Sequence, residues 1–423
     1  MQGAWRTLRA SFLVTSLTTC CFGQQTYTWQ QLEEKFEASN PALKAAQDNI
    51  TESRAEEITA YLRPNPDFSL TADGTQITPY QGTWRPLSGT FYSPGISYLH
   101  EREHKRELRL ESAKKTTEVT VAQYEDQKRG MIFNLRNAFV QVLQAKAILQ
   151  NARNNLQYWD HELKINKDRW TAGDEAQVDY QRLLLQRVQF ESDYETALVN
   201  LRTSKITLLQ LLNDRTPLDS FDVTGTFDFG DRLQTLENYR TTALINRPDL
   251  RAAVQSVALA KTNYDLAVAN GSPDPTFSAW YTHNGSYNNP NAYNTIGLSV
   301  SIPLRIFDRN QGEKARTLVD IRRNERLREA AQAQVFNDVD SAYVTLQSTV
   351  NLLRPYKETY LEVATSVRDK VEFAYQHGGA SLLDELDAEK AYRDTQLAYI
   401  NLVGSYLVAA AQLNMAVGQE VLD

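Results

Sequence analysis

The sequence predicts a mainly α-helical protein with a small β portion, built from one structural unit that occurs twice. Three pairs of motifs return in the same order and at nearly constant separation, which indicates an internal duplication. Long stretches rich in Glu, Lys, Arg, Gln, Ala and Leu predict helices far longer than those of a globular domain. Short segments of alternating apolar and polar residues predict the strands.

The duplicated motifs divide the 423-residue chain into two halves. Their separations are 207, 209 and 205 residues. We expect a signal peptide at 1–23, a first repeat at 24–212, a linker at 213–246, a second repeat at 247–418 and a tail at 419–423. The motif pairs are Asn40-Pro41-x-Leu43 and Arg247-Pro248-x-Leu250, Pro64-x-Pro66-x-Phe68 and Pro273-x-Pro275-x-Phe277, and Trp170-x2-Gly173-x5-Asp179 and Tyr375-x2-Gly378-x5-Asp384.

The first residues have the pattern of a secretory signal peptide. Arg6 and Arg9 precede a short apolar stretch that is too short to span a bilayer as a helix. Cleavage after Gly23 would remove both cysteines of the chain. The alternative is a lipoprotein site in which Cys20 becomes the acylated first residue, although Thr19 is a poor residue before the cut. Past residue 23 we expect no transmembrane helix, so membrane insertion would need strands.

Each half begins with a short helix, at Pro41 and at Pro248, because proline suits the first helical position. Strands follow at about 68–74 and 93–100 in the first repeat and at about 275–283 and 295–303 in the second. The clearest alternation has Ile296, Leu298, Val300 and Ile302 on one face. A membrane barrel needs at least about eight strands to close, and four cannot. Either several copies share one barrel, or the strands are soluble hairpins that pack on the helices.

Two long helical hairpins are expected, at about 101–212 and about 308–418. Their apolar residues recur in steps of three and four. In the first hairpin the mean step is 3.5, which is the period of a coiled-coil seam. A helix of such length extends about 100 Å, which suits a tube or a stalk. The expected seams are Leu135, Phe139, Val142, Ala145, Leu149, Ala152, Leu156, Trp159 and Leu163, and Val339, Ala342, Leu346, Val350, Leu353, Tyr356, Tyr360, Val363, Val367 and Val371.

Composition excludes several classes of function. The net charge of −7 leaves no basic footprint for nucleic acid. No phosphate-binding glycine loop, serine elbow or cysteine nucleophile is visible, so we expect no enzyme and no cofactor. His100-Glu101-Arg102-Glu103-His104 matches the zinc motif H-E-x-x-H, but it lies in a run of charges without an apolar helical face. We therefore predict no resident metal, and the cargo of a transporter cannot be read from these residues.

The chain resembles the outer-membrane efflux proteins of the TolC family, particularly the branch that serves resistance-nodulation-division pumps for metals and drugs. The duplicated motifs match that family. The most specific stretch is Gly297-Leu298-Ser299-Val300-Ser301-Ile302-Pro303-Leu304-Arg305-Ile306-Phe307-Asp308-Arg309-Asn310-Gln311-Gly312. The resemblance implies a homotrimer that spans the outer membrane and extends into the periplasm. Three chains with four strands each would share a twelve-stranded β-barrel above an α-helical barrel, docked to a periplasmic adaptor protein and an inner-membrane pump.

The resemblance also implies roles for residues at the hairpin tips. Asp384 and Asp387 would narrow the periplasmic entrance, although acids in a first helical turn also complement the helix dipole. Tyr375 and Asp179 would tether the two hairpins. The arginine expected in that tether falls at Ala380. The alternatives are a weaker tether or a different pair, such as Glu175 or Arg182 with a neighbour. The adaptor would dock at the tips around Gly173, Gly378 and Gly379.

Two functions follow from these observations. The first is a passive trimeric exit duct that carries small toxic solutes, metal ions or drugs, across the periplasm and the outer membrane. The second is a periplasmic coiled-coil scaffold without channel activity, anchored by lipid at Cys20. The alternation from Ile296 to Ile302 separates them, because a soluble scaffold does not need a strand with an apolar face.

Overall fold

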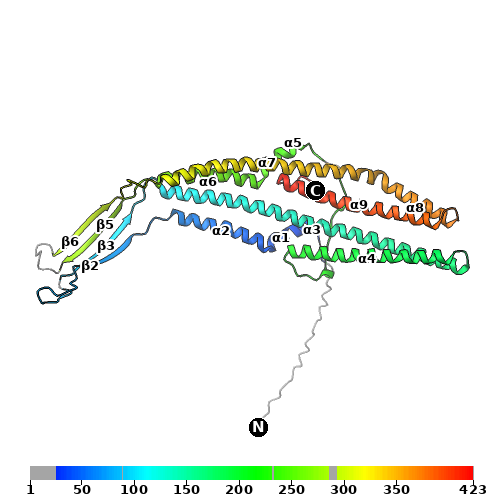
Figure 1. Ribbon diagram of the computed structural model, residues 1–423, viewed down its shortest axis with the longest axis horizontal. Coiled ribbons are helices and arrows are strands. Elements are labelled where there is room, and N and C mark those ends of the chain that lie inside the picture. Colours follow the sequence, from blue (N-terminus) through cyan, green and yellow to red (C-terminus); the bar gives the residue numbers. More distant parts are fainter. Residues whose placement is uncertain (1–24, 88, 231–232, 285–292, 423) are drawn as a thin grey trace, which may run out of the picture.

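The protein is an elongated molecule with a β-sheet at one end and the turns of two helical hairpins at the other (Figure 1). The computed structural model describes residues 25–87, 89–230, 233–284 and 293–422. The expected signal peptide at 1–23 and the candidate lipidation residue Cys20 lie outside the described residues.

The two halves contain the same elements in the same order, and the predicted mainly helical, duplicated fold is confirmed. The first half comprises α1 (Trp29–Ser39), α2 (Pro41–Tyr61), β2 (Asp67–Asp73), β3 (Phe91–Leu99), α3 (Lys105–Ala172) and α4 (Gln177–Leu211). The second comprises α5 (Leu236–Asn246), α6 (Pro248–Ala269), β5 (Thr276–Asn284), β6 (Asn294–Ser301), α7 (Gln311–Pro355), a π-helical turn (Tyr356–Tyr360), α8 (Leu361–Gln376) and α9 (Leu382–Val417).

The four strands that follow α2 and α6 form one antiparallel sheet in the order β2-β3-β5-β6. Their ends differ slightly from the predicted ones. Strand β3 begins at Phe91, two residues earlier than expected, and β6 ends at Ser301 instead of 303. Ile302 therefore lies beyond the strand, because Pro303 next to it cannot donate a backbone hydrogen bond to a ladder.

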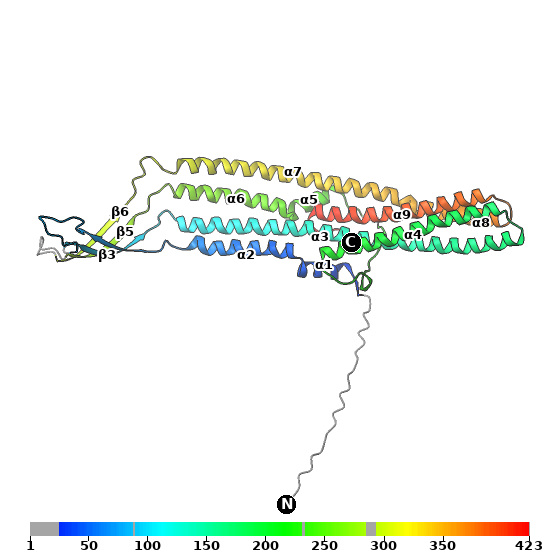
Figure 2. The same cartoon turned by 60° about the horizontal axis from the view of Figure 1, so that its bottom comes forward.

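Short elements lie against the long helices near mid-length (Figure 2). Strand β1 (Gln25–Tyr27) pairs in parallel with β4 (Phe221–Val223), which follows a short 3-10 turn, Leu218–Ser220. The β1–β4 pair joins the start of the described chain to the linker between the repeats. Beside it lies the core of the first repeat, where Leu32, Phe36, Leu135, Leu208 and Phe221 are buried together.

The two long arms differ. Helix α3 runs without a break for 68 residues, and Leu135, Val142 and Trp159 of its predicted seam are buried. The second arm stays helical from α7 to α8 but contains a π-helical turn after Pro355. Pro355 lacks the amide hydrogen that a helix needs, and the chain continues through the π-helical turn before α8.

The second predicted seam is buried only up to Leu353. Tyr360 at the end of the π-helical turn, and Val363 and Val367 beyond it, are 50%, 51% and 45% exposed. These seam residues are therefore only half covered within the described chain. Their apolar surface is available to another molecule.

Helix α9 corrects the expectation that no helix past residue 23 is apolar enough to cross a membrane. By length and composition it could do so. Half of its most apolar window is buried, however, and Val403, Ala410 and Leu413 pack with Leu346 of α7 in the core of the second repeat. We interpret α9 as a core helix, because burial by protein explains the same composition.

Candidate functional site

The sheet has one apolar face and one polar face. Cross-strand neighbours on the apolar face form rows such as Phe68, Ile96, Ala279 and Leu298. Phe68 is 74% exposed and Leu298 is 79% exposed. A soluble protein rarely leaves such a continuous apolar surface in water, whereas lipid accepts it.

The opposite face carries small and hydroxyl side chains. The Ser93 and Thr282 hydroxyls lie 2.9 Å apart across two strands. Phe91, Leu99 and Trp280 are large exceptions on this face. The Trp280 indole ring covers Gly297 so closely that a Cβ there would lie 2.2 Å from the ring. Glycine at 297 is therefore required for this ring position. The polar face suits the water-filled interior of a barrel.

Both outer strands of the sheet have an unpaired edge within the described part of the chain. β2 pairs with β3, and β6 pairs with β5. Such edges cannot face lipid, because their backbone groups would lack hydrogen-bond partners.

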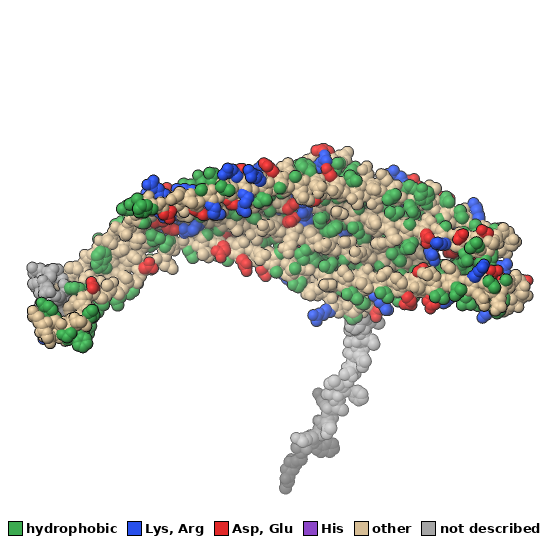
Figure 3. All heavy atoms as spheres, in the orientation of Figure 1, with side chains coloured by type: hydrophobic (Ala, Val, Ile, Leu, Met, Phe, Trp, Pro, Cys, Tyr) green, Lys and Arg blue, Asp and Glu red, His purple; other side chains and the backbone are tan. Residues whose placement is uncertain are grey.

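Figure 3 shows one face of the whole molecule. Few charged side chains lie at its sheet end, whereas acidic and basic side chains are frequent along the helices.

At the other end of the molecule, each hairpin turns at a glycine in the left-handed conformation. Gly173 has φ +88° and its amide donates to the Trp170 carbonyl at 3.1 Å. Gly378 has φ +74°, and the Gly379 amide donates to the Ala374 carbonyl at 2.7 Å. Glycine adopts this conformation without the steric cost of a Cβ atom.

The two predicted entrance carboxylates are exposed in the first turns of α9. Asp384 also caps the helix: its Oδ2 accepts hydrogen bonds from the Ser381 amide at 2.9 Å and from the Ser381 hydroxyl at 2.7 Å. These hydrogen bonds lower the pKa of Asp384. The helix-capping interpretation is therefore realised at Asp384, whereas Asp387 is an exposed side chain outside this capping box.

In the structure, the Tyr375 hydroxyl contacts residues of the first hairpin other than Asp179. The Tyr375 hydroxyl donates to Glu175 Oε1 at 2.7 Å and to Asn166 Oδ1 at 3.3 Å. Asp179, the predicted partner, lies inside the first turn of α4, with Arg182 at 3.5 Å. Glu175 takes its place because it precedes the helix, in the turn that faces Tyr375. Burial, followed by this hydrogen bond, raises the pKa of Tyr375.

The contact between the two hairpins contains three buried glutamates that sequence reasoning missed. Glu162, Glu385 and Glu389 are 5%, 7% and 5% exposed. They lie beside an apolar cluster that includes Trp159 and Leu382. The signal was present in the sequence, since Leu382, Glu385 and Glu389 share one helical face, at spacings of three and four.

Electrostatics at these glutamates is strongly perturbed. Burial, followed by the carboxylates of Glu162 and Glu372, raises the pKa of Glu385 to about 8. Burial raises the pKa of Glu389 to about 7, against the opposing effect of Arg368. Glu385 and Glu389 each have one Oε2 atom that is buried without a hydrogen-bond partner among the described residues.

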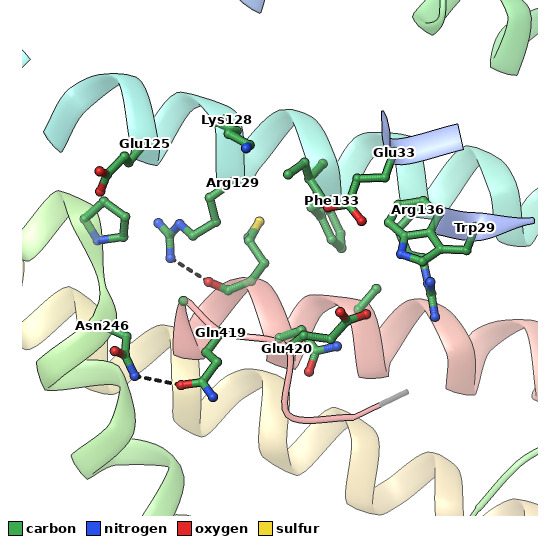
Figure 4. Close-up of a pocket in the computed structure, with 16 residues that line it drawn as sticks. Trp29, Glu33, Glu125, Lys128, Arg129, Phe133, Arg136, Asn246, Gln419 and Glu420 are labelled. Atoms are coloured by element: carbon green, nitrogen blue, oxygen red, sulfur yellow. Dashed lines mark hydrogen bonds between the residues drawn. The ribbon is translucent and has the colours of Figure 1, made fainter. Parts of the chain in front are cut away.

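A cavity of about 360 Å³ lies at mid-length (Figure 4). A hydrogen bond from Arg129 connects the two repeats here. Arg129 on α3 donates to the Met415 carbonyl at 2.5 Å, and the Asn246 amide donates to Gln419 at 3.0 Å. The Arg136 guanidinium stacks over the Trp29 ring, 4.5 Å from its centroid. This arrangement joins the C-terminal end of the second repeat to the first.

The zinc motif at residues 100–104 is not helical. His100 follows β3, and Glu103 and His104 have positive φ angles of 56° and 54° before α3 begins. The two histidines therefore do not share a helical face as metal-binding H-E-x-x-H requires. Among the described residues, no group of three or more His, Cys, Asp or Glu side chains could hold a metal ion.

Comparison with known proteins agrees with this geometry. Among curated proteins, the chain is 24% identical to the outer membrane protein TolC of Vibrio cholerae, covering 90% of this chain and 87% of the relative. It is 22% identical to the cobalt-zinc-cadmium resistance protein CzcC of Cupriavidus metallidurans, covering 90% of this chain and 87% of that relative.

Solved structures share the fold. The crystal structure of CusC matches with a TM-score of 0.77 at 18% identity, over 92% of each chain. The open-state MtrE channel of Neisseria gonorrhoeae matches with a TM-score of 0.75 at 17% identity, over 100% of this chain and 98% of that one. The family model for the outer membrane efflux protein matches residues 32–214 and 240–419. The chain therefore belongs to the outer membrane efflux protein family, as its sequence predicts.

Proposed function

We propose that three copies of this chain form a passive exit duct across the periplasm and the outer membrane. The observation that carries the proposal is the sheet. It has an apolar face, a polar face and two unpaired edges. Pairing β6 of one copy with β2 of the next gives the backbone groups of both edges hydrogen-bond partners. Three copies then supply twelve strands, which is enough to close a barrel.

The helices support the same assembly. The exposed side of α4 carries Leu185 and Val188, which are 74% and 60% exposed, and α8 carries Val363 and Phe373, which are 51% and 63% exposed. Neighbouring copies would cover these residues when the hairpins stand side by side in a tube. The tips around Gly173, Gly378 and Gly379 would then be the docking end for a periplasmic adaptor and its inner-membrane pump.

In this duct, Asp384 and Asp387 of three copies would surround one axis at the periplasmic entrance. Carboxylates at a narrow opening favour cations and oppose anions. Because Asp384 also caps α9, Asp387→Asn is the cleaner test. We expect lower cation selectivity in single-channel recordings, and unchanged selectivity would remove Asp387 from the entrance.

Electron microscopy of the full chain extracted from outer membranes tests the assembly. We expect a threefold cylinder well over about 100 Å long, given the length of the helices. Monomeric or compact particles would contradict the shared barrel and favour the scaffold anchored by lipid at Cys20.

A pair of variants tests the orientation of the sheet. Leu298→Arg places a charge on the apolar face and should disfavour insertion by about 2–4 kcal/mol per chain, so trimer yield should fall. Ser299→Arg, one residue away on the polar face, should leave trimer yield unchanged. Equal yields of both variants would contradict the lipid-facing assignment.

The cargo is proposed only as a class of small toxic solutes. One relative is named for resistance to cobalt, zinc and cadmium, and another, OpmQ of Pseudomonas aeruginosa, for pyoverdine export. Growth of a deletion strain on metal salts and on organic drugs, with and without the gene, distinguishes metal ions from drugs. We assign no catalysis, cofactor or resident metal to the chain.

A further inference from the structure

The contact between the two hairpins buries carboxyl groups where coiled coils usually bury apolar side chains. Glu385 and Glu389 project from α9 toward α3 and α8, close to the tips of the hairpins. Both are at least nine-tenths buried, and one oxygen of each lacks a hydrogen-bond partner among the described residues. A buried, ionised carboxylate without such partners is strongly destabilised.

We propose that Glu385 and Glu389 form a proton-binding site that holds the two hairpin ends together when neutral and loosens them when ionised. Opening of the duct by this route rests on the proposed function. The proton site itself does not, because it depends only on contacts within one chain.

The charged neighbours of Glu385 are glutamates, whereas Glu389 has both glutamates and two arginines, Arg368 and Arg393, near it. Arg368 contacts Asp369 at 2.6 Å. Arg393 lies 3.8 Å from Asp193 of α4, and its buried Nη1 atom has no hydrogen-bond partner among the described residues. Neither cation hydrogen-bonds to the two glutamates. The titratable and charged groups that face the site come from four segments. They are Tyr158, Glu162 and Arg169 of α3, Glu175 of the turn between α3 and α4, Arg368, Glu372 and Tyr375 of α8, and Arg393 of α9.

The direction of the effect follows from linkage. In the packed arrangement the pKa of Glu385 is about 8 and that of Glu389 about 7, compared with 4.5 for a solvated glutamate. The packed arrangement therefore binds more protons than a separated one, and raising the pH favours separation. Protonation of the two carboxyls stabilises the packed hairpin ends fully below about pH 4.5. This stabilisation is lost progressively as the pH rises through about 7 to 8.

Hydrogen exchange of the full-length protein in detergent measures this loosening directly. Between about pH 5.5 and 8.5, after correction for intrinsic exchange, opening of the hairpin ends should increase at least about tenfold. The variant Glu385→Gln with Glu389→Gln should stay packed at both pH values, because the amides are neutral and similar in shape. The control is Glu358→Gln with Glu362→Gln, which has the same spacing on the same hairpin but exposed side chains.

The control should keep the pH dependence of the parent. Hydrogen exchange that does not change with pH in the parent, or a Glu385→Gln, Glu389→Gln double variant that follows the parent, would overturn the proposal.

Infrared titration of the parent is a second test that needs no variant. It should show buried protonated carboxyls at about pH 6 that ionise between about 7 and 8, and their absence at pH 6 would also overturn the proposal.

Single-channel recording over the same pH range separates this inference from the proposed function. Conductance that rises with pH in the parent and not in the double variant supports both. Hydrogen exchange that responds to pH without any conductance in the assembled protein would retain the proton site and reject the duct.

Discussion

The two hairpin ends occupy duplicated positions in the chain but differ in chemistry. The spacing that relates Gly173 to Gly378 also relates Tyr180 to Glu385 and Leu184 to Glu389. In the first hairpin, Trp170 stacks on Tyr180 with ring centroids 5.2 Å apart. In the second, the equivalent face of the return helix carries buried carboxyls.

The difference also concerns which side of the helix is covered. Leu184 of α4 is 44% exposed, whereas Glu389 at the equivalent position of α9 is 5% exposed. Duplication therefore repeated the backbone without repeating the environment. Equivalent substitutions in the two hairpins should have unequal effects, and the three paired variants below test this asymmetry in order of expected size.

Leu382→Ala should have the largest effect. Leu382 is 7% exposed and packs with Trp159 and Leu183, so the lost contacts and the cavity should reduce local stability by about 2–5 kcal/mol. Its counterpart Gln177 is exposed, and Gln177→Ala should change stability by no more than about 0.5 kcal/mol. Hydrogen exchange of the tip peptides measures both. Similar losses would contradict the asymmetry.

Tyr375→Phe should have an intermediate effect. It removes the 2.7 Å hydrogen bond to Glu175, and a hydrogen bond to a charged acceptor contributes about 1.5–3 kcal/mol. Trp170→Phe, at the equivalent position, keeps an aromatic ring on Tyr180 and should lose less than about 1 kcal/mol.

Single-channel recordings should show a higher open probability for Tyr375→Phe than for Trp170→Phe, because only the first variant breaks a contact between the hairpins. The reverse order would show that the Trp170 stack, and not Tyr375, holds the ends together.

Substitutions at the N-caps of the two return helices should have the smallest effects on stability. The two effects should have opposite signs. Ser381 and Asp384 form a capping box at the start of α9, whereas Ala176 at the start of α4 makes no side-chain cap. Ser381→Ala should destabilise the second return helix by about 1 kcal/mol. Ala176→Ser recreates the same pattern with Asp179 and should stabilise the first by up to about 1 kcal/mol. Exchange rates that change in the same direction for both would contradict this prediction.

Much of the fold could be predicted because it depends on local patterns. The helix starts at Pro41 and Pro248, the tip glycines and the period-two face from Ile296 to Val300 all come from residues close in sequence. The π-helical turn after Pro355 could not be predicted in this way, because the apolar periodicity continues through it.

The candidate site could be predicted only in part. The positions of Asp384 and Tyr375 at the tips follow from the glycine turns that precede and follow them. The partner of Tyr375 does not, because Asp179 and Glu175 differ by four residues and only the packing of α3 against the second hairpin selects Glu175. Glu385 and Glu389 read as ordinary charges on an amphipathic helix until that packing buries them.

The sequence by itself determined the duplication, the two long hairpins, the two-faced strands and the family, because each depends on periodicity or on short motifs. Tertiary structure alone decided which side of each return helix is covered, which carboxylate accepts the hydrogen bond from Tyr375 and which glutamates are buried. The physical reason is that burial and pKa depend on neighbours brought from about 200 residues away in the chain, and no local pattern records those neighbours.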